Sequence, residues 1–167
     1  EEVRGISMSK FHLNVREAEY LDVAILKLFN QNMALETEGK RLDGQVLEKG
    51  IKGFLENDRH GFYLIAENLD QKAVASLAIT YEWSDWRNAL FWWIQSVYVK
   101  EAFRRKGVFS KLYEAVKIRA KKEPNVCGVR LYVEQSNKSA QATYFSLGMK
   151  KSHYQMWEET FPTKEHE

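Results

Sequence analysis

The chain is poor in cysteine and histidine, which limits its chemistry. Cys127 is the single cysteine among 167 residues, so no internal disulfide can form. It follows a helix stop with no histidine close in sequence, and we interpret it as a small buried residue rather than a nucleophile. The histidines lack the paired spacing of metal ligands, so we expect no metal site. They are His12, His60, His153 and His166.

The chain also lacks a long apolar run and a strong excess of one charge. No segment has the length of a membrane span, and residues 1–4 are not those of a signal peptide. The net charge of +2 is too small to indicate a nucleic-acid partner, although residues 104–106 and 117–122 are locally basic. We therefore expect a cytoplasmic protein without a membrane or nucleic-acid partner.

What is present is the composition of a folded domain. The chain is 44% hydrophobic and 29% charged, close to the globular average. Its length of 167 residues suits a single core. Because periodic apolar residues begin only at Phe11, we predict a tail over residues 1–10, disordered or added for expression, and one domain over residues 11–160.

Apolar spacing predicts an alternation of strands and helices over this domain. Alternating apolar residues indicate strands, and spacings of three and four indicate helices. The run 90–99 is apolar on both parities, which is typical of a strand in the centre of a sheet. Expected strands are 11–15, 62–66, 73–81, 90–99, 129–133 and 149–158; expected helices are 21–29, 44–56, 108–122 and 138–146, the last capped by Asn137 and Gly148.

Cations gather around a glycine between the strand 90–99 and the helix 108–122. Arg104-Arg105-Lys106-Gly107 lies directly before the helix, whose first N–H groups lack internal acceptors. A loop that turns these donors inward can bind a phosphate. From this pattern alone a solvated basic turn is an equal alternative. The Lys-Ser/Thr ending of a P-loop and a G-x-G-x-x-G after a strand are both missing, which disfavours those nucleotide sites.

Two blocks of the sequence resemble motifs of one family. Residues 104–109 resemble the cofactor motif Q/R-x-x-G-x-G/A of the GCN5-related N-acetyltransferase (GNAT) family, with Arg104 and Gly107 matching and Phe109 departing. Residues 137–149 resemble its later pattern N-x-x-A-x-x-x-Y-x-x-x-G-F/M. The blocks occur in the family's order, and the resemblance extends over residues 11–157. Residues 81–86 are loosely similar to diamine and polyamine acetyltransferases.

The resemblance implies a fold and a cofactor. The fold would be a single α/β (α+β) domain with a mixed, mostly antiparallel sheet, a splayed pair of parallel strands and helices on both faces. Acetyl-CoA would enter between the splayed strands and pair with the backbone at Val97 and Val99. A homodimer is compatible with the resemblance. The remaining cofactor contacts implied are the N–H groups of Arg105, Lys106, Gly107, Val108 and Phe109, the side chains of Arg104 and Lys106, and Asn137.

The resemblance also implies catalytic roles. Tyr144 would be the general acid that protonates the departing CoA thiolate, and a core tyrosine is the alternative. Gln95 stands where polyamine-type relatives have a glutamate, and an amide cannot be a base. The base is left open among water and the carboxylates Glu36, Glu82, Asp85 and Glu134. The expected acceptor pocket comprises Trp83, Trp86, Gln95 and Glu134, whereas Trp92 and Trp93 are expected to fill core.

The activity that follows is transfer of an acetyl group from acetyl-CoA to a primary amine of a small molecule by direct attack. Other functions stay open at this point. One is acetylation of protein N-termini or lysines. Another is a CoA-binding regulatory module without turnover, which the departures at Gln95 and Phe109 motivate. A nucleic-acid-binding domain is the weakest reading, because no motif of that kind occurs.

Overall fold

The computed structural model describes residues 12–162, so the tail predicted over residues 1–10 lies outside the described part. The described chain forms two compact units that divide after Leu131. The first unit contains β1 (Asn14–Glu17), α1 (Val23–Glu38), α2 (Gly44–Leu55), β2 (Gly61–Glu67), β3 (Ala73–Ser84), β4 (Ala89–Val99), α3 (Val108–Lys122) and β5 (Val126–Arg130), with single turns of 3-10 helix at Tyr20–Asp22 and Glu101–Phe103. The second contains α4 (Lys138–Ser146).

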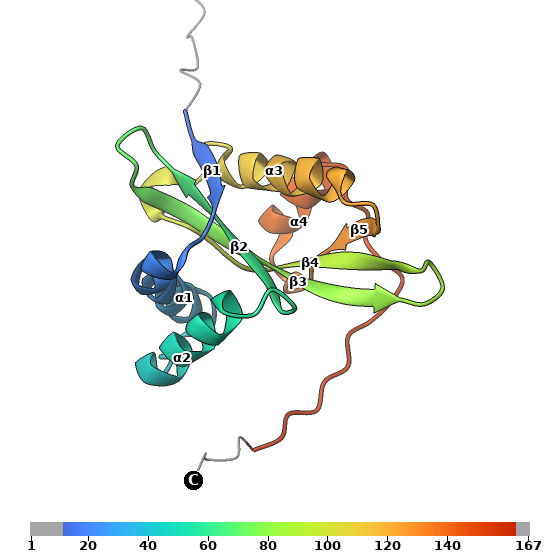
Figure 1. Cartoon of the computed structure of the whole chain (residues 1–167), viewed down its shortest axis with the longest axis horizontal. Helices are drawn as coiled ribbons and strands as arrows, with labels where there is room; N and C mark the ends of the chain where they lie inside the picture. The colour runs from blue at the N-terminus through green and yellow to red at the C-terminus, as the bar shows by residue number, and fades with distance from the viewer. Residues whose placement is uncertain (1–11, 163–167) are drawn as a thin grey trace, which may run out of the picture. The chain divides into compact units, whose positions relative to one another are not determined.

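The first unit is built on a five-stranded sheet in the order β1-β2-β3-β4-β5. Pairing is antiparallel from β1 through β4, and β5 joins β4 in parallel. Figure 1 shows α3 on one side of the sheet and α1 and α2 on the other. This confirms the predicted α/β architecture, a mostly antiparallel sheet with one parallel pair and helices on both faces.

Each sheet face has its own apolar contacts because side chains alternate along the strands. On one face Val23, Leu26 and Ile51 of α1 and α2 pack against Tyr63 and Ile65 of β2. On the other face α3 presents a buried stripe at intervals of four residues. The stripe consists of Val108, Leu112, Val116 and Ala120.

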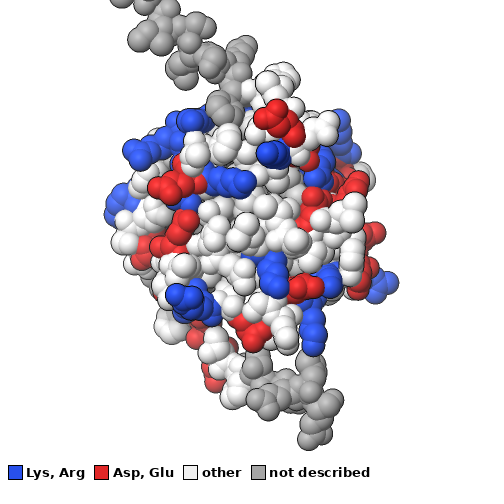
Figure 2. Space-filling model, turned by 90° about the vertical axis from the view of Figure 1, so that its left-hand side faces the viewer, with Lys and Arg blue, Asp and Glu red and all other residues white. Residues whose placement is uncertain are grey.

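Mixed charge covers much of the first unit's surface. Arg16 pairs with both Asp22 and Glu67, and this holds the pKa of Asp22 below its usual range. Arg104 pairs with Glu36 in the same way. On the face drawn in Figure 2, Lys and Arg side chains lie beside Asp and Glu side chains around an uncharged area. Such mixing gives that face no extended positive potential.

Three expectations for the strands of the first unit are wrong. The run 90–99 forms β4, but β3 occupies the centre of the sheet, and β2 is the strand buried along its whole length. β5 begins at Val126 rather than at residue 129, directly after the Pro124-Asn125 stop. Cys127 is exposed rather than buried, because the β4–β5 register skips it between Val126 and Gly128.

The second unit confirms one helix and contradicts one strand. The Asn137 side chain accepts a hydrogen bond from the Ala140 N–H at 3.0 Å, and Gly148 has a φ of 92° just after α4, so both predicted caps are confirmed. The strand expected over 149–158 is absent from the described part. After Met149 that segment makes no backbone–backbone hydrogen bond with a described residue, and a strand needs a partner.

Gly61 provides a test of the β2–β3 contact. A β-carbon at this residue would lie 1.7 Å from the carbonyl oxygen of Ile79, and its φ is 140°. Gly61→Ala should therefore lower the free energy of unfolding by at least about 2 kcal/mol. Gly53→Ala in α2, where a β-carbon meets nothing within 4 Å, should instead raise it by about 0.5–1 kcal/mol. Urea unfolding measures both, and equal stabilities would contradict the close approach.

Candidate active site

A bulge interrupts β4 close to its end. Between the pairs Ala78–Gln95 and Ser76–Tyr98, β4 has one more residue than β3. Ser96 takes a φ of 50° there, in the left-handed region that residues other than glycine seldom adopt. Its side chain hydrogen-bonds Tyr63 from β2. Because a bulge bends the strand that carries it, the last residues of β4 take a new direction.

β4 and β5 pair over only part of their length. The parallel ladder joins Leu90 to Val126 at one end and Trp93 to Arg130 at the other. From Ile94 to Val99 this edge of β4 has no strand partner among the described residues. The Lys100 N–H donates to Val74 on β3, so strand alternation turns the backbone of Val99 to the unpaired edge. Among the described residues no strand pairs with the edge of β4 that carries Val97 and Val99, although the Val99 carbonyl accepts from the Arg104 side chain.

The loop after β4 brings backbone donors to the start of α3. Arg105 and Gly107 both have left-handed φ values, 58° and 75°. Gly107 caps α3, and the Lys111 N–H is the first to reach an acceptor one turn back, the Gly107 carbonyl. The preceding helical N–H groups are those that an α-helix leaves unpaired. A β-carbon on Gly107 would meet nothing within 4 Å, so the space beside these donors is open.

Two cationic side chains of the loop, those of Arg104 and Lys106, have partners within their own unit. Arg104 donates to the Val99 carbonyl at 2.9 Å and to the Glu36 carboxylate of α1 at 2.5 Å, and this pairing raises the Arg104 pKa. The Lys106 ammonium lies 5.8 Å from the centre of the Phe103 ring. Arg104 therefore connects the loop to α1 and β4, while the backbone provides the open donors.

Phe109, which departs from the family motif, lies inside the first turn of α3. Its ring stacks on Tyr113 one turn later, with 6.1 Å between ring centres. The side chain therefore packs along the helix, and its bulk does not alter the left-handed geometry at Gly107.

Three polar side chains meet where β4 and β5 separate. Glu82 accepts from the Trp93 indole at 3.2 Å and from Arg130 at 2.5 Å, and the Arg130 guanidinium lies 3.6 Å from the centre of the Phe91 ring. Trp93 and Arg130 form the last pair of the ladder. The Glu82 and Arg130 side chains are 39% and 32% exposed, so a small molecule can reach them. We call Glu82, Trp93 and Arg130 the Glu82 cluster.

Gln95 lies on the same face as the Glu82 cluster. Its side-chain amide donates to Thr80, which precedes Glu82 by two residues on β3. The prediction that Trp93 only fills core is wrong, since it is partly exposed and bonded to Glu82, whereas Trp92 is buried as expected. Sequence reasoning missed Arg130 entirely. An arginine inside the apolar run 126–133 was the available signal.

Trp83 and Trp86 do not join Gln95. They are 56% and 87% exposed at the β3–β4 hairpin, and alternation puts Trp83 on the opposite face from Glu82. Trp83 pairs with Leu90, five residues before Gln95, which corresponds to roughly 17 Å along a strand. Of the predicted acceptor pocket, Gln95 alone therefore lies beside the Glu82 cluster in the first unit.

Tyr144, Asn137 and Glu134 belong to the second unit. Burial raises the pKa of the Tyr144 phenol, which keeps it protonated at neutral pH. Ser136 hydrogen-bonds Glu134 and lowers the pKa of that carboxyl. Asp85 accepts from the Trp86 N–H in the hairpin turn. Of the four carboxylates considered as the base, Glu82 is the one bonded to Trp93 and Arg130.

Among residues 12–162 no cluster of three or more His, Cys, Asp or Glu side chains is arranged to hold a metal ion. No helix in this part of the chain has the length and apolarity needed to cross a bilayer.

Comparison with known proteins places these features in one family. The model of the acetyltransferase (GNAT) family matches residues 25–149, which include β4, the loop, α3 and α4. The chain belongs to this family. It is accordingly an N-acetyltransferase of the acetyl-CoA-dependent type. No curated protein sequence matches the chain.

Solved structures agree with the GNAT assignment. A possible acetyltransferase from Clostridium difficile 630 is 46% identical, with 90% of this chain and 99% of that chain covered and a TM-score of 0.84. A predicted acetyltransferase with acetyl-CoA from Clostridium acetobutylicum is 17% identical, covers 89% and 96%, and has a TM-score of 0.71. Glucosamine-6-phosphate N-acetyltransferase from Arabidopsis thaliana is 18% identical, covers 89% and 98%, and scores 0.67. The last two show the fold alone.

A substitution at Gly107 tests whether the loop before α3 binds the phosphates of acetyl-CoA. Gly107→Val would put two methyl groups into the open space beside the α3 donors, and we expect the affinity for acetyl-CoA to fall at least about tenfold, or 1.4 kcal/mol. Gly39→Val is the matched control. Gly39 has a φ of 64° at the end of α1 and an equally open β-carbon position, so it should lose similar stability while still binding acetyl-CoA. Calorimetry measures the affinity for acetyl-CoA. An equal loss of affinity in both variants would contradict the role of this loop in binding the phosphates.

Proposed function

We propose that the chain transfers the acetyl group of acetyl-CoA to a primary amine of a small molecule by direct attack. One observation carries the proposal. The unpaired edge of β4, which suits an extended pantetheine arm, begins at Trp93 and Arg130, and these residues also hold the carboxylate of Glu82. A thioester lying at this edge and an amine bound at Glu82 would then be neighbours.

The cofactor would be held mainly by backbone groups. The pantetheine amides would pair with Val97 and Val99 in the manner of an added strand. The N–H groups of Arg105, Lys106, Gly107, Val108 and Phe109 would bind the pyrophosphate at the positive end of α3. Lys106 would add countercharge, and Arg104 would fix the loop through Glu36. Asn137 would contribute a further contact in addition to capping α4.

The Glu82 cluster would recognise the acceptor. A carboxylate beside an indole ring suits a cationic amine, since Glu82 supplies the opposite charge and Trp93 a ring face. The positive charge of Arg130 offsets the negative charge of Glu82. The bound ammonium is therefore held less strongly in its charged form and can lose its proton more easily. Gln95 would orient the acceptor as a hydrogen-bonding group. The proton would pass from the ammonium to water near Glu82 before attack.

The reaction balances when the nitrogen loses two protons and the sulfur gains one. The neutral amine nitrogen attacks the thioester carbonyl and forms the N–C bond, the nitrogen of the tetrahedral intermediate gives its extra proton to water, and the C–S bond then breaks. Tyr144 would donate its phenolic proton to the departing thiolate, giving free CoA, and would regain a proton from solvent. The raised pKa of Tyr144 supports this role because the phenol must be protonated at the moment of collapse.

An acceptor panel tests the proposed substrate class. We expect thiol release from acetyl-CoA with small cationic amines, represented by putrescine, spermidine, glucosamine and kanamycin, and none with a peptide whose lysines and N-terminus are free. Glu82→Gln should raise KM for the accepted amine at least about tenfold, because the charge that binds it is lost. Asp85→Asn is the control and should match the parent. Thiol release with the peptide but with none of the small amines would refute the small-molecule assignment, and so would a lack of release with every amine of the panel.

Tyr144→Phe tests the general acid. Removing the phenol should lower kcat by about 10²–10⁴-fold while acetyl-CoA affinity stays within a factor of two. Burial raises the Tyr144 pKa, so the parent rate should hold through neutral pH and fall only above the ordinary tyrosine value of about 10. Tyr154→Phe, at an exposed tyrosine of the same unit, should change neither quantity. An unchanged kcat in Tyr144→Phe would exclude the residue as the acid.

A further inference from the structure

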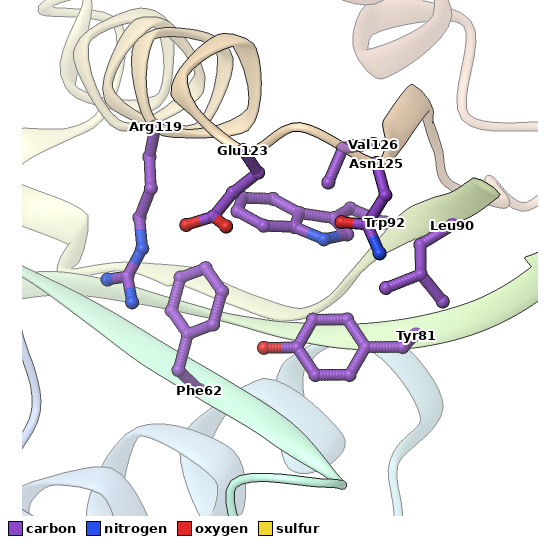
Figure 3. A pocket seen from close by; sticks show the side chains of 8 residues that line it. All are labelled: Phe62, Tyr81, Leu90, Trp92, Arg119, Glu123, Asn125 and Val126. Carbon is purple, nitrogen blue, oxygen red and sulfur yellow. The ribbon is translucent and has the colours of Figure 1, made fainter.

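A pocket of about 220 Å³ lies between the C-terminal end of α3 and the start of β4 (Figure 3). Leu90 and Trp92 line it, whereas the proposed cofactor loop follows Val99, roughly 23–30 Å further along the strand. Trp92 also faces away from the Glu82 cluster, because it neighbours Trp93 on the strand. The pocket is therefore separate from both the proposed cofactor site and the proposed acceptor site.

Three aromatic rings in mutual contact form the walls. The ring of Phe62 meets that of Trp92 edge-on, with centres 5.2 Å apart, and Tyr81 lies 6.1 Å from Trp92 and 6.5 Å from Phe62. Phe62 and Trp92 are almost fully buried. Rings that contact one another at such angles are fixed in place, so the pocket is preformed.

Two aromatic side chains in these walls carry hydrogen-bond donors that lack acceptors. Trp92 is 3% exposed, yet its indole N–H has no acceptor among the described residues. Among those residues Ser76 Oγ is the sole fully enclosed side-chain polar atom without a partner, so the indole nitrogen borders open space. Figure 3 shows this nitrogen on the side of the ring that faces Tyr81. The Tyr81 hydroxyl likewise has no partner in the described part. A ligand with an acceptor group would satisfy both donors.

Charges of opposite sign stand at the rim. Arg119 lies in the last turn of α3 and Glu123 caps the end of that helix, but the two side chains do not pair with each other. Arg119 instead donates to Glu17 at 2.6 Å and places its guanidinium 3.9 Å from the centre of the Phe62 ring. The Glu123 carboxylate makes no ion pair with a described residue, and in Figure 3 it points into the space between Arg119 and Trp92.

We infer that this pocket binds a small zwitterion of the α-amino acid class. The ligand's carboxylate accepts from the Trp92 indole and the Tyr81 hydroxyl beside Arg119, and its ammonium lies against Glu123 and the aromatic rings. An aliphatic side chain then contacts Leu90. Neither a simple amine nor a simple acid matches both the free donors and the free carboxylate. The inference concerns binding only and does not rest on the proposed function.

Indole N–H resonances provide the test. The protein has five tryptophans, and Trp92→Phe identifies the signal of Trp92 in a ¹⁵N-¹H spectrum. Titration with glycine, L-valine and L-leucine should move this signal downfield and saturably for at least one of them, while the Trp93 signal stays in place. 3-Methylbutylamine and 4-methylpentanoate, which are leucine without its carboxylate and without its amine, should bind at least about tenfold more weakly.

Two variants complete the test, one at the C-cap of α3 and one within the helix. Glu123→Gln should weaken amino-acid binding at least about fivefold by removing the partner of the ammonium. Glu114→Gln, at an exposed carboxylate of α3 outside the pocket, should bind as the parent does. The inference is overturned if none of the three amino acids moves the Trp92 signal, if either half-ligand binds as tightly as leucine, or if Glu123→Gln binds like the parent. None of these outcomes bears on acetyl transfer, which is measured separately by thiol release.

Discussion

Buried backbone N–H and C=O groups are nearly always hydrogen-bonded, and the structure depends on a stretch of β4 whose outer edge has no strand partner among the described residues. β5 pairs with β4 only as far as Trp93, so the remaining edge of β4 has no strand partner among the described residues. On one side of this unpaired edge lies the Glu82 cluster, and beyond its far end lies the loop that precedes α3. A ligand that completes the sheet would therefore contact both.

Several local features make this unpaired edge rigid. The bulge at Ser96 is bonded to Tyr63, and Arg104 bonds the Val99 carbonyl and Glu36 at once. The cofactor loop is thus joined to β2 through the sheet and to α1 through an ion pair. Ordered surroundings lower the entropic cost of binding a long, flexible molecule such as acetyl-CoA. Most of the groups that we propose for cofactor binding are backbone atoms, which side-chain substitution leaves unchanged.

The sequence predicted what local pattern determines. The α3 stripe, the hairpin between β2 and β3, the α4 caps and the loop around Gly107 all depend on residues near one another in the chain. It could not predict the Glu82 cluster, because Glu82, Trp93 and Arg130 come from three strands and meet only through the register of the sheet. The prediction of a strand over residues 149–158 is wrong for a related reason. Alternation of apolar residues indicates which side chains would share a face, but it does not show whether a neighbouring strand is there to pair with. Cys127 is exposed because of a register shift that no residue pattern marks.

The extra residue in β4 has a consequence for how this family member can vary. Gln95 and Tyr98 lie on the same sheet face although they are an odd number of residues apart, and the residue that makes this possible is the one inserted at the bulge. Deleting one residue there would turn every following side chain of β4 to the opposite face of the sheet. Tyr98 would then point away from Phe29 of α1, and the backbone groups of Val97 and Val99 would point toward β3 instead of away from it. Substitutions along this stretch alter contacts one at a time, whereas a change in its length would invert the strand. The number of residues between Trp93 and Val99 is therefore under tighter physical constraint than the identity of most of them.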